Sequence, residues 1–256
     1  MMGFRVLLIK ELREQLRTNR FIAVAAVFVL FGIVGPLTDR YMKELIDAIG
    51  SQGGGFSIQV PGPSLDGAGS QILKNLSQFG IICALLLSMG SVAWEKERGT
   101  AGMILTKPAS RAAFLAAKLV AISLTLGVAV ALGTGFGYVY TLLLYPTAFP
   151  LGGYVAMALL MWLMLVVFAA ITLLGSTLTR SAIAAAGIGL VALVAFGILS
   201  VLPVIGGYMP SSLGTPALDL MLGRDPGWIL GPVLFNAGLI VALFAVAWGA
   251  FRRQEL

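Results

Sequence analysis

Apolar residues dominate six long runs of this chain, and short polar stretches separate them. A helix needs about 20 mostly apolar residues to cross the hydrocarbon core of a bilayer. Strands of a membrane barrel would be about ten residues long with alternating polarity, a pattern that these runs lack. Because lipid offers no partner to free backbone groups, the runs predict helices. The six predicted spans are 21–37, 72–93, 119–145, 152–174, 182–202 and 229–251.

The composition agrees with this pattern. Hydrophobic residues make up 59% of the chain and charged residues only 11%, whereas a soluble domain is about 25% charged. The sequence therefore predicts an all-α integral membrane protein, with residues 1–256 forming a single transmembrane domain. No soluble module remains to carry nucleic-acid binding, so the net charge of +6 is not expected to indicate a nucleic-acid partner.

The basic residues are distributed unevenly between the two sides of the predicted bundle. Six spans place both termini on one side, and that side carries 13 of the 17 Lys and Arg residues. Cytoplasmic loops of membrane proteins carry an excess of Lys and Arg. We therefore expect both termini to be cytoplasmic.

Two extracytoplasmic segments are predicted to be longer than turns. Segment 38–71 begins with an amphipathic stretch, for which we expect a short interfacial helix, and continues as a Gly- and Pro-rich loop. Segment 203–228 is interrupted by four prolines. Within it, Thr215 followed by Pro216 predicts the start of a short helix. That helix is apolar enough to re-enter the edge of the bilayer, and a plain extracytoplasmic loop is the alternative.

Residues 4–18 predict an amphipathic interfacial helix ahead of the first span. Four leucines and Phe4 share one arc of this helix, and basic residues occupy the opposite arc. Glu11 lies inside the apolar arc, where a carboxylate is costly without a partner. One interpretation is a membrane-surface anchor. The other is that Glu11 contacts a cytoplasmic protein.

Residues 94–111 form the densest charge cluster of the chain. Gly99 and Pro108 bracket a helix-sized stretch, and Ser110 is suited to cap the helix that follows. The apolar centre, Met103 to Leu105, is too short to span a membrane. Such a segment suits docking into a hydrophobic groove of a partner protein. A loop lying on lipid headgroups is the alternative.

Several kinds of chemistry are excluded by composition. The chain has no histidine and one cysteine, Cys83, which excludes His-based catalysis and zinc sites. It also lacks a GxxxxGKS/T phosphate loop, so we expect neither an enzyme nor a bound cofactor. No ionisable residue lies near a predicted midplane, which disfavours ion-coupled transport. Lys74 and Lys118, near span ends, are expected to reach out to the interface.

The third span contains Gly133 and Gly137 at GxxxG spacing. Small residues let two helices approach closely. Packing within the chain is the favoured interpretation, and packing across a dimer is the alternative.

Two groups of residues resemble the signature of the ABC-2 type permeases, the membrane subunits of a large class of ABC transporters. One group runs from Glu97 through Thr100 and from Leu105 through Arg111 and ends with Lys118. The other is Lys10-Glu11-Leu12 followed by Arg20. Gly214-Thr215-Pro216, with Leu218 and Asp219, resembles the subgroup that includes the permease of the nitrous-oxide reductase maturation transporter.

The resemblance implies a transmembrane subunit of an exporter in the cytoplasmic membrane of a prokaryote. Two permease copies, identical or different, would pair with two separate ABC ATPase subunits, which would bind ATP and Mg²⁺. The implied ATPase-coupling residues are Glu11, Glu95, Glu97, Arg98, Gly99, Thr100, Met103, Ile104, Leu105, Lys107, Pro108 and Arg111. The implied re-entrant segment near the exit contains Thr215, Pro216, Leu218 and Asp219. The alternatives are an ATP-independent secondary transporter or channel, and a membrane scaffold or assembly subunit.

Overall fold

The computed structural model describes residues 2–52, 62–99 and 110–254, and within these ranges the regular structure is entirely helical. Six helical segments of this part are long and apolar enough to cross a membrane, which confirms the predicted number of spans. They are α2 (Arg20–Gln52), α3 (Leu65–Met89) continued by α4 (Ala93–Glu97), α6 (Arg111–Leu144), α7 (Leu151–Leu178), α8 (Ala182–Leu199) and α10 (Leu230–Arg252).

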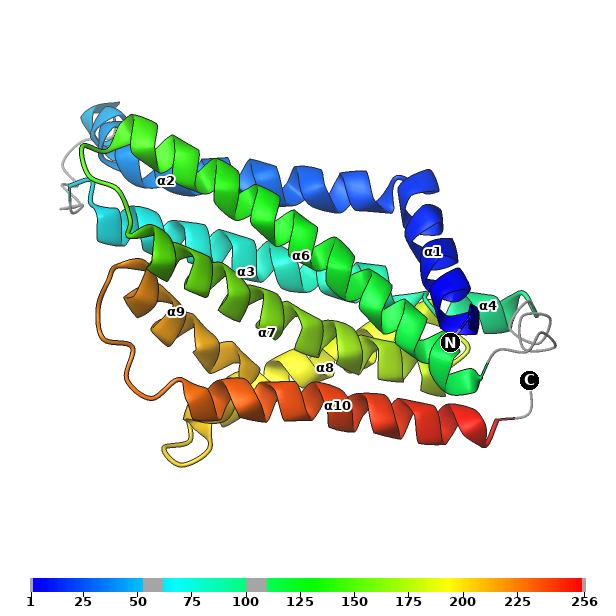
Figure 1. The fold of residues 1–256 in the computed structure, drawn as a ribbon. Coiled ribbons are helices and arrows are strands. Elements are labelled where there is room, and N and C mark those ends of the chain that lie inside the picture. The colour runs from blue at the N-terminus through cyan, green and yellow to red at the C-terminus, as the bar shows by residue number, and fades with distance from the viewer. Residues whose placement is uncertain (1, 53–61, 100–109, 255–256) are drawn as a thin grey trace.

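The shorter elements mark the two ends of the helical bundle (Figure 1). Helix α1 (Met2–Arg17) lies across one end, together with α4 and the C-terminal end of α10, and we call this the α1 end. At the other end, which we call the α9 end, α8 is followed by η1 (Gly206–Tyr208), η2 (Pro210–Leu213) and α9 (Gly214–Met221). Helices α3 and α6 run between these two ends.

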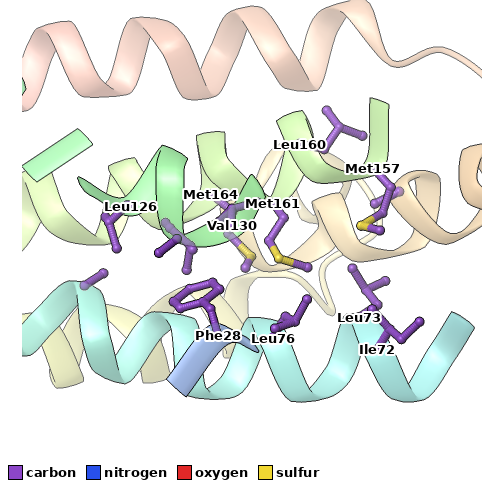
Figure 2. Close-up of a cluster of buried hydrophobic side chains, with 14 of the residues drawn as sticks. Phe28, Ile72, Leu73, Leu76, Leu126, Val130, Met157, Leu160, Met161 and Met164 are labelled. Atoms are coloured by element: carbon purple, nitrogen blue, oxygen red, sulfur yellow. The ribbon is translucent and has the colours of Figure 1, made fainter. Parts of the chain in front are cut away.

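Helix α7 is the central helix of the bundle and packs against α3, α6, α8, α9 and α10. It is hydrophobic on all sides, as expected for a buried helix. Figure 2 shows the core between α7 and its neighbours: Met161 and Met164 point toward Phe28 of α2 and Leu76 of α3. Methionine suits such irregular spaces because its unbranched side chain adapts its shape.

Helices α2 and α6 touch through glycine backbones. A Cβ built on Gly32 would lie 2.1 Å from the carbonyl oxygen of Gly133, and one built on Gly133 would lie 2.7 Å from that of Phe28. Gly137 also faces the backbone of Gly32. The GxxxG pair therefore packs within the chain, as the favoured interpretation predicted.

The predicted boundaries of segment 38–71 are wrong at both ends. Helix α2 continues unbroken to Gln52, so the expected interfacial helix is an extension of the first span. Helix α3 begins at Leu65, seven residues before the predicted start, because Ser64 accepts a hydrogen bond from the amide of Gly67 and caps the helix. Of the predicted Gly- and Pro-rich loop, residues 53–61 lie outside the described part of the chain.

A turn at Thr18 and Asn19 separates α1 from α2. Asn19 has a φ of 55°, in the left-handed region that asparagine tolerates better than most residues. The amide of Ala23 donates to the carbonyl of Asn19, which starts α2 directly after the turn. This turn lets α1 leave the axis of α2 and lie against α6.

Candidate functional site

A buried lysine connects three elements at the α1 end. The side chain of Lys118 on α6 is 2% exposed. Its Nζ lies 3.0 Å from Oε1 of Glu11 on α1 and 3.0 Å from Oε1 of Glu95 on α4. The expectation that Lys118 reaches out to the interface is therefore wrong, because α1 covers it and supplies a carboxylate.

Lys10 completes this group of charges. Its Nζ lies 3.0 Å from Glu11, 2.8 Å from Glu95 and 3.3 Å from Glu14. We call Lys10, Glu11, Glu14, Glu95 and Lys118 the α1 ionic cluster. The three carboxylates each place an oxygen within 4.8 Å of the others, a spacing that could hold a metal ion. The ammonium groups of Lys10 and Lys118 already lie among these carboxylates, so the geometry does not require a metal ion.

The charges of the cluster shift two pKa values outside the membrane-spanning segments. Burial by itself would raise the pKa of Glu11, but the ammonium groups of Lys118 and Lys10 lower it below its ordinary value. Burial would lower the pKa of Lys10, but its bond to Glu95 and the charges of Glu11 and Glu95 raise it. Removing one partner of a buried ion pair typically costs about 3–5 kcal/mol.

These shifts predict how the attachment of α1 depends on pH. The stabilisation by Glu11 is present above its ordinary pKa of 4.5 and is lost as the pH falls through its lower folded value. That of Lys10 is present below its ordinary 10.5 and is lost as the pH rises through its higher folded value. We expect α1 to stay docked from about pH 5 to 10.

The mobility of a spin label on α1 checks this expectation. The label is placed at Arg13, an exposed position, in a Cys83→Ala background that removes the chain's other thiol. The signal should be constant through neutral pH and become mobile only in acid below about pH 4.5. Release of α1 near pH 6 in the unaltered cluster would contradict the assignment.

Two further contacts fix α1 and α2 at this end. The hydroxyl of Thr125 on α6 donates to Oε1 of the buried Gln15. The guanidinium of Arg20, the first residue of α2, lies 4.7 Å from the ring centroid of Trp94 on α4, a cation–π distance. Arg20 and Trp94 line a pocket of about 410 Å³ together with the α1 ionic cluster.

Helix α4, which carries part of the predicted coupling segment, is attached to α7 by hydrogen bonds. The hydroxyl oxygen of Ser176 on α7 accepts from the amides of Val92 and Ala93, at 3.1 and 2.9 Å. Lys96 donates to the carbonyl of Thr177 at the end of α7. Together these bonds attach α4 to the last turn of α7.

The residues that follow are exposed on the surface. Glu97 and Arg98 are both exposed, and Gly99 has a φ of 68°, which favours glycine. The remaining predicted coupling residues lie outside the described part of the chain: Thr100, Met103, Ile104, Leu105, Lys107 and Pro108.

Arg111 has a structural partner that the sequence did not indicate. Its Nη1 donates to the carbonyl oxygens of Phe251, Arg252 and Gln254, at 2.9, 2.9 and 3.0 Å. A cation at the C-terminal end of a helix satisfies free carbonyls and the helix dipole. Arg111 therefore joins the first turn of α6 to the last turn of α10. The predicted cap of α6 is confirmed, since Ser110 accepts from the amide of Ala113.

At the α9 end, the predicted short helix is present as α9. It begins at Gly214, one residue before the predicted start, and follows η2 directly. Ala217 and Met221 are buried against the core, whereas Thr215 is exposed and Pro216, Leu218 and Asp219 are half-buried. The segment is thus packed into the bundle rather than extended as a plain loop.

Two side chains hold the elements around α9 in place. Arg224 forms two bonds to the carboxylate of Asp66 at the start of α3, at 2.7 and 2.9 Å. Asn236, which is fully buried in α10, donates from Nδ2 to the carbonyls of Tyr208 and Pro232. This buried polar side chain therefore anchors η1 to α10.

The contact between α7 and α9 depends on a single glycine. A Cβ on Gly153 would lie 1.8 Å from the carbonyl oxygen of Leu220, whereas one on the neighbouring Gly152 meets no atom within 4 Å. We expect Gly153→Ala to displace α9 and to lower the stability by about 1–2 kcal/mol. Gly152→Ala, in the same helical turn, should have little effect. Thermal unfolding of both variants in detergent checks this difference, and equal losses would contradict it.

The fold and the α1 end together define a multi-pass membrane protein with an amphipathic N-terminal helix. The sequence profile of the ABC-2 family transporter proteins matches residues 5–220. The chain is also 32% identical over 263 residues to the uncharacterized transmembrane protein YxlG of Bacillus subtilis strain 168, covering 97% of each chain. The chain belongs to the ABC-2 family, whose members are permease components of ABC transporters. The family resemblance predicted from the sequence is confirmed.

Proposed function

We propose that this chain is the permease subunit of an ATP-driven exporter and that a separate ABC ATPase drives it from the α1 end. The observation that supports this most directly is the arrangement around Glu97 and Arg98. These two exposed charges directly precede residues 100–109, and α4 is attached to α7 by Ser176 and to α6 through Glu95. A force applied at this surface would therefore reach several spans.

In this proposal the α1 end faces the cytoplasm and the α9 end faces outward. The basic residues of the α1 end fit the excess of Lys and Arg on cytoplasmic sides of membrane proteins. ATP and Mg²⁺ bind to the partner, and closure of two ATPase subunits moves the residues between α4 and α6. The substrate path lies between two permease copies, and α9 borders its exit.

Coupling by this chain needs only docking and mechanical contact. Glu97, Arg98, Gly99 and residues 100–108 form the docking surface in this proposal. Glu11, Glu95 and Arg111 support that surface through their contacts with Lys118 and with the end of α10. The chain itself contributes no group to ATP hydrolysis.

Affinity purification of the chain from its native membranes in mild detergent tests the proposal. We expect mass spectrometry to identify a soluble ATPase with a GxxxxGKS/T loop at about one copy per permease. Recovery of the chain alone, under conditions that keep a known ABC complex together, would contradict it. In that case, substrate flux in vesicles without ATPase would support a self-sufficient transporter or channel, and its absence a scaffold.

A further inference from the structure

Lys118 lies on α6, one of the six helical segments that are long and apolar enough to cross a membrane. Its charge is 2% exposed and lies 4.9 Å from the ring centroid of Phe114. Glu11 and Glu95, which both contact it at 3.0 Å, come from α1 and α4. A single ammonium group therefore joins two elements at the edge of the bundle to the third predicted span.

Lys118 lies close to the predicted coupling segment along α6. It lies two turns after Arg111, where α6 begins, and the predicted coupling segment is 94–111. Glu95 lies near the start of that segment. The two ends of the segment are therefore connected to each other by Glu95 and Lys118. The α6 side is connected to α1 by the bond from Lys118 to Glu11, and the α4 side by the bond from Lys10 to Glu95.

The energetics favour movement of these elements as one unit. Without the ammonium group of Lys118, the carboxylates of Glu11 and Glu95 would keep only Lys10, a more exposed cation, as their shared partner. Their negative charges would then be poorly balanced on the side that faces α6. Separation of α4 from α6 would break the ion pair between Glu95 and Lys118 and leave these two charges without each other. A small displacement of α4 is therefore expected to move the first turns of α6 as well. The reason is that packed elements joined by ion pairs change between a few discrete arrangements rather than sliding apart.

We propose that Lys118 is a positioning residue that makes α1, α4 and the first turns of α6 move together when the ATPase moves the coupling segment. This inference rests on the proposed function and adds to it a route from the docking surface into the third span. Lys118 does not touch the ATPase in this mechanism. It acts through Glu11 and Glu95.

The test uses the complete complex with its co-purified ATPase in lipid nanodiscs, and it measures assembly separately from turnover. For Lys118→Met we expect normal recovery of the ATPase, an unchanged KM for ATP and a kcat reduced at least about fivefold. Lys118→Arg keeps the positive charge and should retain kcat within about twofold. Lys74→Met, at an exposed position of α3 toward the α9 end, is the matched control.

A second variant guards against misfolding of Lys118→Met. Glu11→Gln keeps an oxygen that can accept from Lys118 but removes the negative charge, and it should also lower kcat with assembly preserved. Glu44→Gln, an exposed position of α2, is its control. A wild-type kcat in both cluster variants would overturn the inference. So would a parallel loss of assembly and kcat, which a purely structural role predicts.

The failure of the proposed function gives a different result. If the wild-type chain recovers no ATPase, the proposed function fails and this inference fails with it. If the wild-type complex forms and hydrolyses ATP while the Lys118 and Glu11 variants behave like their controls, only the inference is overturned.

Discussion

Gly133→Val is expected to lower the stability of the protein by about 3 kcal/mol, while Gly135→Val, two residues later on the same helix, leaves it nearly unchanged. A Cβ on Gly133 would lie 2.7 Å from the carbonyl oxygen and 3.0 Å from the Cβ of Phe28, whereas one on Gly135 meets nothing within 4 Å. The obstructing oxygen belongs to the backbone of α2, so no side-chain rotation can make room.

The size of the effect follows from what must move. Helices α2 and α6 lie against each other over much of their length, and Phe28 is buried in the core beside this contact. In a membrane, close backbone approach and van der Waals packing supply much of the attraction between helices. Separating the pair by the width of a side chain forfeits these contacts along α2.

Unfolding in mixed detergent micelles, followed by circular dichroism, measures this difference. The two variants introduce the same side chain into the same helix, so helix propensity and hydrophobicity cancel in the comparison. Equal stability of the two variants would show that α2 and α6 do not depend on this approach.

Arg98→Glu is expected to reduce recovery of the partner ATPase at least about tenfold while the chain still inserts and folds normally. Arg98 is exposed at the end of α4, at the rim of the pocket that the α1 ionic cluster lines. Reversal of a charge at a docking surface introduces repulsion, and tenfold corresponds to about 1.4 kcal/mol. The result depends on the proposed docking of the ATPase at this surface.

Arg40→Glu provides the matched control for this prediction. Arg40 lies on α2 toward the α9 end, so the same charge reversal falls far from the proposed docking surface. Quantitative mass spectrometry of the co-purified ATPase measures assembly. A size-exclusion profile of each variant measures folding separately. Wild-type recovery of the ATPase by Arg98→Glu would exclude this arginine from the docking surface.

The sequence predicted the spans well because a membrane imposes a simple length requirement. Every one of the six apolar runs became a helix, and the helix start at Ser110 followed from a local capping rule. A short helix near Thr215 was also predicted, but α9 begins at Gly214 without a side-chain cap. The start of α3 was missed because the first two turns of that helix are not apolar, although Ser64 carried a usable capping signal.

The site was predicted less completely, because charges were assigned to surfaces from their position along the chain. Glu11 was identified from its place in an apolar arc, which correctly indicated that it needs a partner. That partner includes Lys118, 107 residues away, and no local pattern connects the two. Arg111 was likewise identified as a charge near the coupling segment, while its bonds to the end of α10 depend on how the helices pack.

The amino-acid sequence by itself determined that this is a helical membrane protein, where its spans lie, and which family it belongs to, because these depend on composition and local order. Only the tertiary structure decided which glycines bring α2 and α6 into contact, and that Lys118 is buried between α1 and α4. Both features depend on the packing of segments that are far apart in the sequence. The neighbours of a buried charge or of a glycine backbone determine whether the charge is paired and whether two helices can approach, and the order of residues does not reveal these neighbours.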